Sequence, residues 1–218
     1  MRRAARGSGA DRSRLVLASH SAAKLRELRE LLELGSATLV SLDELGISAE
    51  PVEDGLTFET NALIKARHAA RATGLPALAD DSGIEVDALG GAPGVRTRRY
   101  AGPDATDDDN NAKLLRELSG MPPERRGGRY VCVLALALPD VSAPGGLRVI
   151  TRRATSRGRV ALEPRGSGGF GYDPIFEPGR ERTGARTFAQ YSPAEKDAIS
   201  HRGRAARRIS PILRELGF

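Results

Sequence analysis

The sequence is short of residues on which several classes of protein depend. It contains no tryptophan, and aromatic residues make up only 4% of its 218 positions, so it lacks the extended stacking platform of a single-strand nucleic-acid binder. Its one cysteine, Cys132, excludes an internal disulfide and a cysteine-built metal site. Cys132 lies in the apolar run Val131–Leu138, where we expect a buried, inert thiol, and this cysteine usage favours a reducing, cytoplasmic location.

Long apolar runs are also absent. None approaches the roughly 20 residues that a membrane-spanning helix needs, so we expect no membrane association. The Arg-rich segment 1–13 has no apolar core behind it, which excludes a secretory signal and predicts a disordered leader rich in Gly, Ser and Ala. The remaining residues, 14–218, are enough for one large domain or two fused lobes.

Lysine is the scarce cation: the chain has 30 arginines and only four lysines, at Lys24, Lys65, Lys113 and Lys196. Such a chain is expected to keep lysine where a compact point charge is needed; the alternative is chance placement on solvated helices. The net charge of +6 and the pI near 10 would suit a nucleic-acid partner. Because the arginines are scattered, or gather in the leader and near the C-terminus, we expect no stable nucleic-acid binding.

Strand and helix signals alternate early in the chain and a long hairpin follows, which predicts an α/β fold with a mixed sheet. A strand is expected at 14–18, followed by a leucine-spaced helix that stops at Gly35. Further helices are expected from Thr57 to Gly74, over 107–118 and after Ser192, and Pro211 is expected to end or kink the last of these. An antiparallel pair of strands is expected at 129–138 and 147–160. We also expect the strand at 76–79 to enter a turn at Asp80–Gly83 before another strand at 84–89.

The segment Ser19–Lys24 lies where the first strand gives way to the first helix. Free backbone N–H groups and the positive end of the helix dipole favour an anion at such a junction. Lys24 falls in the first helical turn, where a cation opposes the dipole, and a bound phosphate would offset that cost. The segment is not a Walker loop, so a solvated surface lysine is the alternative interpretation.

The carboxylate doublet Asp80–Asp81 follows a strand that should be buried. Adjacent strand residues point to opposite faces, so one carboxylate faces the cleft and the other has a supporting role. Glu53 supplies a second acidic group upstream. Mg²⁺ is held by one or two carboxylates with phosphate oxygens and water, and one carboxylate can also take the proton from an attacking water. The alternative is an ordinary turn with a solvent-facing acidic pair.

Glycines surround Phe170 in the segment Gly168–Pro174. They let backbone approach a ligand closely and present the ring from a loop, where a purine can stack on it for ~1–3 kcal/mol. Lys196 and Arg202, predicted on one helix, meet only if the end of that helix reaches the pocket. Both donate hydrogen bonds, which suits a base rich in carbonyl oxygens. The alternatives are a hairpin whose aromatics lie in the core and a basic surface helix.

Taken together, these segments resemble the inosine triphosphate pyrophosphatase family, in particular its bacterial members that act on dITP and XTP. The resemblance covers about Arg14 to Leu216, and it is carried by the order and spacing of Leu15–Lys24, Asp54–Phe58 with Asn61–Ala62, Leu75–Gly83, Gly90–Gly94, Gly169–Pro174, Glu195–Lys196 and Ile199–Gly203. It implies an elongated mixed β-sheet flanked by helices, two lobes with an active-site cleft between them, and a homodimer.

By the same resemblance, the enzyme hydrolyses non-canonical purine nucleoside triphosphates (dITP, ITP and XTP) to the monophosphate and pyrophosphate with Mg²⁺, which keeps them out of DNA and RNA. Asp81 is implied as the catalytic residue and, with Glu53, as a metal ligand. The implied substrate-binding residues are Ser19, His20, Ser21, Ala22, Ala23, Lys24, Ser82, Phe170, Gly171, Tyr172, Asp173, Lys196, His201 and Arg202. The hypothesis requires Asp81 within reach of a triphosphate whose base rests against the Phe170 loop, and it fails if Asp81 lies on the far side of the sheet from that loop.

Three positions depart from the family pattern: Ser21 stands in place of a usual Asn, Arg96 of a common aromatic and Gln190 of a common Glu. A neighbouring alternative is the Maf type of nucleotide pyrophosphatase, which also opens with Leu-Ala-Ser and acts on modified pyrimidine triphosphates. An alternative of another class is a basic nucleic-acid-binding protein without catalysis, which would bind RNA or DNA with steep salt dependence.

Overall fold

The computed structural model describes residues 13–179 and 184–218. The disordered leader that the sequence predicts lies, apart from Ser13, outside the described residues. The helices are α1 (Ala22–Leu31), α2 (Phe58–Thr73), α3 (Asp107–Glu117), α4 (Pro193–Ile199) and α5 (His201–Glu215), and the strands are β1 (Arg14–Leu17), β2 (Thr38–Ser41), β3 (Ala77–Val86), β4 (Gly127–Pro139), β5 (Leu147–Val160) and β6 (Phe176–Pro178). No helix among these residues is long and apolar enough to cross a membrane.

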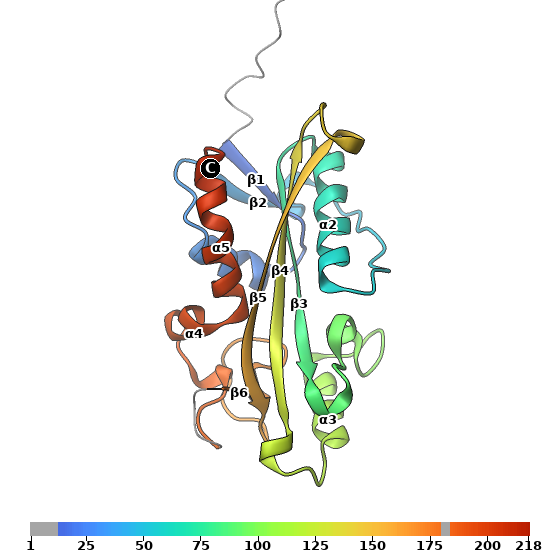
Figure 1. The fold of residues 1–218 in the computed structure, drawn as a ribbon, viewed down its shortest axis with the longest axis vertical. Helices are drawn as coiled ribbons and strands as arrows, with labels where there is room; N and C mark the ends of the chain where they lie inside the picture. The colour runs from blue at the N-terminus through green and yellow to red at the C-terminus, as the bar shows by residue number, and fades with distance from the viewer. Residues whose placement is uncertain (1–12, 180–183) are drawn as a thin grey trace, which may run out of the picture.

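One mixed sheet runs the length of the molecule, in the order β2-β1-β3-β4-β5-β6. β1 pairs parallel with β2 and β3, and the other neighbours are antiparallel. β4 and β5 form the predicted long pair, from Gly127 opposite Arg159 to Pro139 opposite Leu147. Figure 1 shows an elongated shape, with α2 and α5 on opposite sides of the sheet. The predicted α/β fold with an elongated mixed sheet is therefore confirmed.

The side chains of β4 explain why its sequence is apolar throughout. Leu134 and Leu136 belong to a core cluster with residues of α1 and α5, whereas Val133 and Ala135 belong to a second cluster with α2. Because helices cover both faces at this end, both alternating sets must be apolar. A third cluster fills the opposite end of the sheet, around Tyr130, with residues of α3 and of the segment 172–191.

The turn expected at Asp80–Gly83 does not exist, and neither does the separate strand at 84–89. β3 is continuous, and each of its residues from Ala77 to Val86 pairs with β4. Gly83 serves a close approach instead, because a Cβ there would lie 2.8 Å from the Thr97 Cβ and 2.9 Å from the Gly94 oxygen. The sequence suggested a turn because polar residues interrupt an apolar run, but the structure gives those side chains buried partners.

The helix expected after Ser192 is in fact two helices. The capping box at Ser192 is confirmed, but α4 ends where Ser200 adopts extended angles (φ −68°, ψ 159°), and the Ser200 hydroxyl caps α5 by accepting from the Gly203 N–H. Pro211 does not end α5, which continues to Glu215. Pro211 lies on the exposed side of α5, where water can satisfy the carbonyl that loses its partner.

Candidate active site

The predicted junction of strand and helix forms the floor of a cavity. Ser21 is the N-cap of α1, and its hydroxyl accepts from the Lys24 N–H at 3.3 Å, while the Ser21 N–H donates to the Ser19 hydroxyl at 3.1 Å. No acidic residue lies in the first turn of α1, so its free N–H groups keep their attraction for an anion. The serine at 21 thus caps α1 through its hydroxyl oxygen, which accepts a hydrogen bond as the side-chain oxygen of the usual asparagine can.

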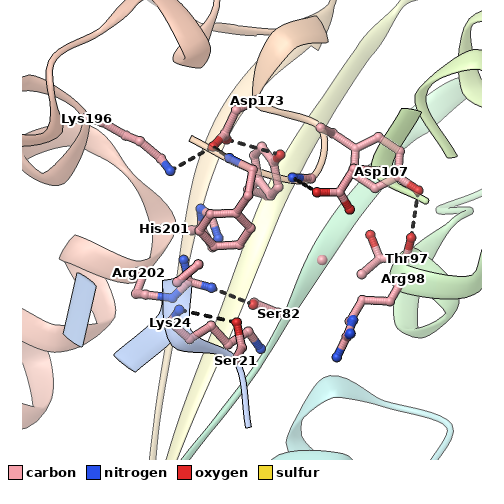
Figure 2. Close-up of a pocket in the computed structure, with 16 residues that line it drawn as sticks. Ser21, Lys24, Ser82, Thr97, Arg98, Asp107, Asp173, Lys196, His201 and Arg202 are labelled. Carbon is pink, nitrogen blue, oxygen red and sulfur yellow. Dashed lines mark hydrogen bonds and ion pairs between the residues drawn. The ribbon is translucent and has the colours of Figure 1, made fainter. Parts of the chain in front are cut away.

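Lys24 does not depend on a substrate phosphate for its counter-charge. Its Nζ lies 2.5 Å from Asp80 Oδ1 and donates to the Asp80 carbonyl at 3.3 Å. Burial lowers the pKa of Lys24, and the nearby Asp80 charge opposes that shift. The ammonium is thereby held against β3, at the edge of the cavity, as Figure 2 shows.

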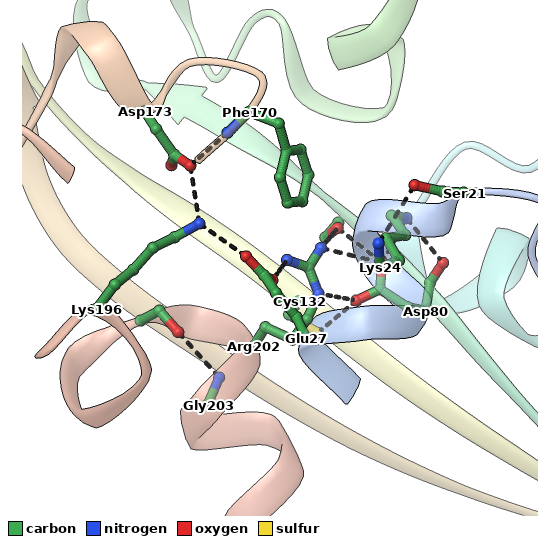
Figure 3. A network of polar contacts seen from close by, with 12 residues as sticks. Ser21, Lys24, Glu27, Asp80, Cys132, Phe170, Asp173, Lys196, Arg202 and Gly203 are labelled. Atoms are coloured by element: carbon green, nitrogen blue, oxygen red, sulfur yellow. Dashed lines mark hydrogen bonds and ion pairs between the residues drawn. The ribbon is translucent and has the colours of Figure 1, made fainter. Parts of the chain in front are cut away.

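Asp80 is the buried member of the doublet and anchors a charge network (Figure 3). Its side chain is completely inaccessible and lies 3.0 Å from Arg202 Nε. It also accepts hydrogen bonds from the Ser82 hydroxyl at 2.8 Å and from the Cys132 thiol at 3.2 Å. Burial raises the pKa of Asp80, but the charges of Arg202 and Lys24 outweigh it and hold the pKa well below its usual range. The predicted division of the doublet gives Asp80 the supporting role.

Asp81 points to the opposite face, where α2 lies. Its Oδ1 is 2.5 Å from Lys65 Nζ, and the same ammonium is 3.3 Å from Glu53 Oε2. Burial raises the pKa of Asp81 despite the opposing charge of Lys65. For Lys65, burial lowers the pKa, but the charges of Asp81 and Glu53 outweigh it and raise the pKa. The structure therefore brings the two predicted metal ligands together on one positive group.

Lys65 is a site residue that the sequence interpretation missed, although the scarcity of lysine was a usable signal. Its position between Glu53 and Asp81 also tests the fit of a metal, since it shows that the two carboxylates converge on a single cation. Within 13–179 and 184–218, no group of three or more His, Cys, Asp or Glu could hold a metal ion. A pair of carboxylates completed by phosphate oxygens and water is the donor set that Mg²⁺ uses with nucleotides.

Asp81 and the Phe170 loop point toward different faces of β3, which is the arrangement that the sequence-based hypothesis named as its failure. The assumption behind that condition, that the sheet separates the two faces, is wrong here, because both residues open into adjoining cavities. β1 ends at Leu17 and pairs with β3 only as far as Leu78, so the edge of β3 beyond it is uncovered by strand. A cavity of about 670 Å³ holds Asp81 and Lys65, and one of about 270 Å³ holds Phe170. Ser21, Lys24, Ser82, Thr97, Arg98 and Asp107 line both. A ligand can therefore pass over the edge of β3 from one cavity to the other.

Lys196 and Arg202 converge even though they lie on different helices, because Glu27 of α1 lies between them. Lys196 Nζ is 2.9 Å from Glu27 Oε1 and 2.8 Å from Asp173 Oδ2. Arg202 Nη1 is 2.5 Å from Glu27 Oε2. Burial raises the pKa of Glu27, but the charges of Arg202 and Lys196 outweigh it and lower the pKa. Glu27, which the sequence interpretation missed, joins α1 to the two cations that line the smaller cavity (Figure 3).

Aromatic rings and a neutral histidine form the wall of the smaller cavity. His201 is buried and stacks on Tyr130, with centroids 4.5 Å apart and planes inclined by 4°. Burial and the Arg202 charge hold the pKa of His201 well below its usual range, so the imidazole is uncharged, and its Nδ1 has no partner among the described residues. The Phe170 ring lies 5.0 Å from Lys196 Nζ. Tyr172 is buried and donates to the Thr97 carbonyl at 2.8 Å.

The remaining predicted site residues do not all line the same cavity. Ser19 and His20 line the larger cavity, with His20 Nδ1 2.6 Å from Asp43 Oδ1, and Ala23 lines the smaller one. Ala22 is exposed and lines neither of the two cavities. Of the departures from the family pattern, Arg96 faces a separate groove, and the Gln190 side chain accepts from the Thr187 N–H at 3.0 Å. Neither touches the Asp81 cluster.

Comparison with known proteins identifies the family of this chain. The sequence profile of the Ham1 family matches residues 15–212. The chain belongs to the Ham1 family. A dITP/XTP pyrophosphatase of Cutibacterium acnes is 51% identical, over 92% of this chain and 96% of that protein. One from Mycobacterium tuberculosis is 50% identical, over 94% of this chain and 97% of that protein.

Solved Ham1 structures share the fold. A HAM1 protein from Coxiella burnetii has 43% identity and a TM-score of 0.81, covering 93% of this chain and 98% of that one. A nucleoside-triphosphatase / dITP/XTP pyrophosphatase from Mycobacterium abscessus has 45% identity and a TM-score of 0.70, covering 91% and 99%. The resemblance inferred from the sequence is therefore confirmed.

Proposed function

We propose that this Ham1 protein is a nucleoside-triphosphate pyrophosphatase that hydrolyses dITP, ITP and XTP to the monophosphate and pyrophosphate, and so removes them from the nucleotide pool. The observation that carries the proposal is that Asp81, Lys65 and Glu53 share one cavity with the segment Ser19–Lys24. The adjoining cavity has the Phe170 ring in its wall, on which a flat base can stack. The names of the relatives support the same activity, and the comparisons give the Maf-type alternative no support.

The phosphate chain lies over the uncovered edge of β3. The N-terminus of α1 offers backbone N–H groups, and Lys24 offers a compact positive charge whose position Asp80 fixes. Because this charge is held in place before substrate binds, little reorganisation is needed as negative charge grows on the phosphate oxygens. Ser82 lines both cavities between the phosphate and base ends, and its hydroxyl donates to Asp80 and accepts from Arg202.

Glu53 and Asp81 would hold Mg²⁺. When bound, the ion neutralises phosphate charge and lowers the pKa of a coordinated water. Asp81, whose carboxylate opens into this cavity, would accept the proton of the attacking water. Water then attacks the α-phosphorus, the bond from that phosphorus to the bridging oxygen breaks, and pyrophosphate leaves. Lys65 orients Asp81 and adds positive charge beside the transferred group.

Base selection follows from the donors at the smaller cavity. Lys196 and Arg202 each keep one N–H beyond those bound to protein groups, so a 6-keto oxygen satisfies these donors and a 6-amino group does not. A donor left unpaired costs ~1–3 kcal/mol, which corresponds to a discrimination of roughly 5- to 150-fold against adenine nucleotides. Stacking on Phe170 adds affinity for any purine.

We further propose that the enzyme acts as a homodimer in the cytoplasm. The family resemblance supports the dimer, and the single buried cysteine supports a reducing compartment. Light scattering during size-exclusion chromatography gives the mass of the particle directly. A mass near the 23.2 kDa of one chain at micromolar concentration would contradict the dimer.

A substrate panel tests the proposed function. Pyrophosphate release is measured with dITP, ITP, XTP, the four standard deoxynucleotides and a modified UTP, each with Mg²⁺ and with excess EDTA. We expect rapid release from the first three, little from the others, and none with EDTA. Activity confined to the modified UTP would favour the Maf type, and binding to DNA without any release would favour the nucleic-acid alternative.

A further inference from the structure

Two side chains of α3 hold the glycine that follows Phe170. Asp107 Oδ2 accepts from the Gly171 N–H at 2.6 Å, and Asn111 Nδ2 donates to the Gly171 carbonyl at 3.0 Å. Asp107 and Asn111 are four residues apart on one helix, so they lie on the same face and act together. Figure 2 shows Asp107 reaching the loop from the wall of the cavity opposite Lys196. This pair is called the α3 clamp below.

The α3 clamp is itself fixed to the strand that carries Asp81. Asn110 accepts from the Ala101 N–H at 2.8 Å and donates to the Arg98 carbonyl at 3.1 Å. Arg98 belongs to the short helix Gly94–Arg99, which packs on β3. Continuous contacts therefore run from β3 through α3 to the Phe170 loop. The position of the ring is set relative to the strand at which the phosphate is cleaved.

Besides the Tyr172 hydroxyl, which donates to the Thr97 carbonyl, the loop is attached on its far side. Asp173 accepts from the Phe170 N–H at 2.9 Å and binds Lys196. Gly171 adopts a left-handed conformation, with φ +64°, so the chain direction between these two attachments depends on how the Gly171 peptide groups are held. Asn111 is 5% exposed, so its bond to the Gly171 carbonyl is shielded from competing water.

We propose that Asp107 and Asn111 are positioning residues for base recognition. By holding the N–H and the carbonyl of Gly171, they fix the Phe170 ring in the orientation that stacks on a purine, so their loss weakens binding of the base and leaves the phosphate site intact. Stacking contributes fully only when the ring is ordered before the ligand arrives. This inference rests on the proposed function for its substrate, but not for its structural test.

The kinetic test uses Asp107→Ala, with Asp107→Asn as the conservative variant and Asp108→Ala as the control. Asp108 is the next residue of α3, is exposed, and lines neither cavity. We expect Asp107→Ala to raise KM for dITP about tenfold, the loss of one charge-assisted hydrogen bond, with kcat changed less than about twofold. Asp107→Asn keeps an acceptor oxygen and should restore most of the affinity. Inhibition by free pyrophosphate, which needs no base, should be unchanged in Asn111→Ala and Asp108→Ala, whose residues line neither cavity.

The structural test needs no substrate. Because the chain has no tryptophan, Phe170→Trp introduces a single fluorescent reporter at the position of the ring. Acrylamide quenching of that emission should increase at least about twofold when Asp107→Ala or Asn111→Ala is added, and should not change with Asp108→Ala. Thermal melting checks that each variant is folded, and Asp107, being exposed, can be replaced without disturbing the core.

The outcomes separate the two proposals. If the parent releases no pyrophosphate from dITP, the proposed function fails, and the quenching measurement still decides whether the α3 clamp positions the loop. If the parent is active but Asp107→Ala leaves KM and quenching at parent values, the clamp has no positioning role. Equal weakening of dITP and pyrophosphate binding would also overturn the inference, because it would indicate general damage to the site.

Discussion

The two aspartates of the doublet should fail in opposite ways when each is replaced by asparagine. Burial raises the pKa of Asp80, but Arg202 and Lys24 outweigh it and hold the pKa well below its usual range, so the fold stabilises the charged form. Burial raises the pKa of Asp81 despite Lys65, so the fold disfavours its charged form. Removing the charge should therefore destabilise the protein at Asp80 and not at Asp81.

The magnitude follows from the partners left behind. Asp80→Asn leaves Lys24 without a carboxylate partner among the described residues, and leaves Arg202 with Glu27 alone. Breaking a buried ion pair by removing one partner costs ~3–5 kcal/mol, which for a domain of this size lowers Tm by about 10 °C. Asp81→Asn leaves Lys65 paired with Glu53 beside an open cavity, so we expect Tm within about 3 °C of the parent.

For Asp81, the substitution should affect activity much more than stability. Losing a general base costs roughly 10²- to 10⁴-fold in kcat, so Asp81→Asn should retain the fold and lose turnover of dITP. Circular dichroism melts and pyrophosphate release at 25 °C measure the two effects on the same samples. The reasoning is refuted if Asp80→Asn melts with the parent, or if Asp81→Asn is the variant that unfolds early.

Further predictions concern other parts of the site. Burial and the Arg202 charge keep His201 neutral in the fold, whereas in the unfolded chain it takes up a proton near pH 6.5. The free energy of unfolding should therefore fall as the pH drops below about 6.5, by up to about 1.4 kcal/mol per pH unit from this residue. Urea unfolding at pH 7 and pH 5 should show a smaller fall for His201→Phe than for the parent, and equal falls would contradict the assignment. Arg98 lines both cavities and has no ion pair among the described residues, so we expect it to contact the phosphates. Arg98→Ala should weaken dITP binding about tenfold and dIMP binding little, whereas Arg96→Ala, on a separate groove, should change neither. Equal losses for both nucleotides in calorimetry would count against a phosphate contact. Gly83→Ala should lower stability by about 1–3 kcal/mol, because its Cβ meets Gly94 and Thr97 closer than 3 Å, and an unchanged melting curve would show that this wall is free to move.

Much of the fold could be predicted because local sequence rules were strong enough. The start of α2 after Thr57, its stop at Gly74, the Ser192 capping box and the β4–β5 hairpin were all confirmed. The opposite orientations of Asp80 and Asp81 followed from the period of two in a strand. The errors came where local signals conflicted with packing. A polar pair in an apolar run was interpreted as a turn, but Lys24 and Lys65 supply buried partners that let β3 continue.

The contacts that make the site work join residues far apart in the chain. Glu27 meets Lys196 and Arg202 across 169 and 175 positions, and Asn111 meets Gly171 across 60. No periodicity specifies which of many charged side chains will meet in a cleft, because each pairing depends on how helices pack on both faces and ends of one sheet. The sequence by itself therefore determined most of the strands and helices, the junction of the first strand with α1, and the family. Only the tertiary structure decided which cation holds each carboxylate and which helix holds the aromatic loop.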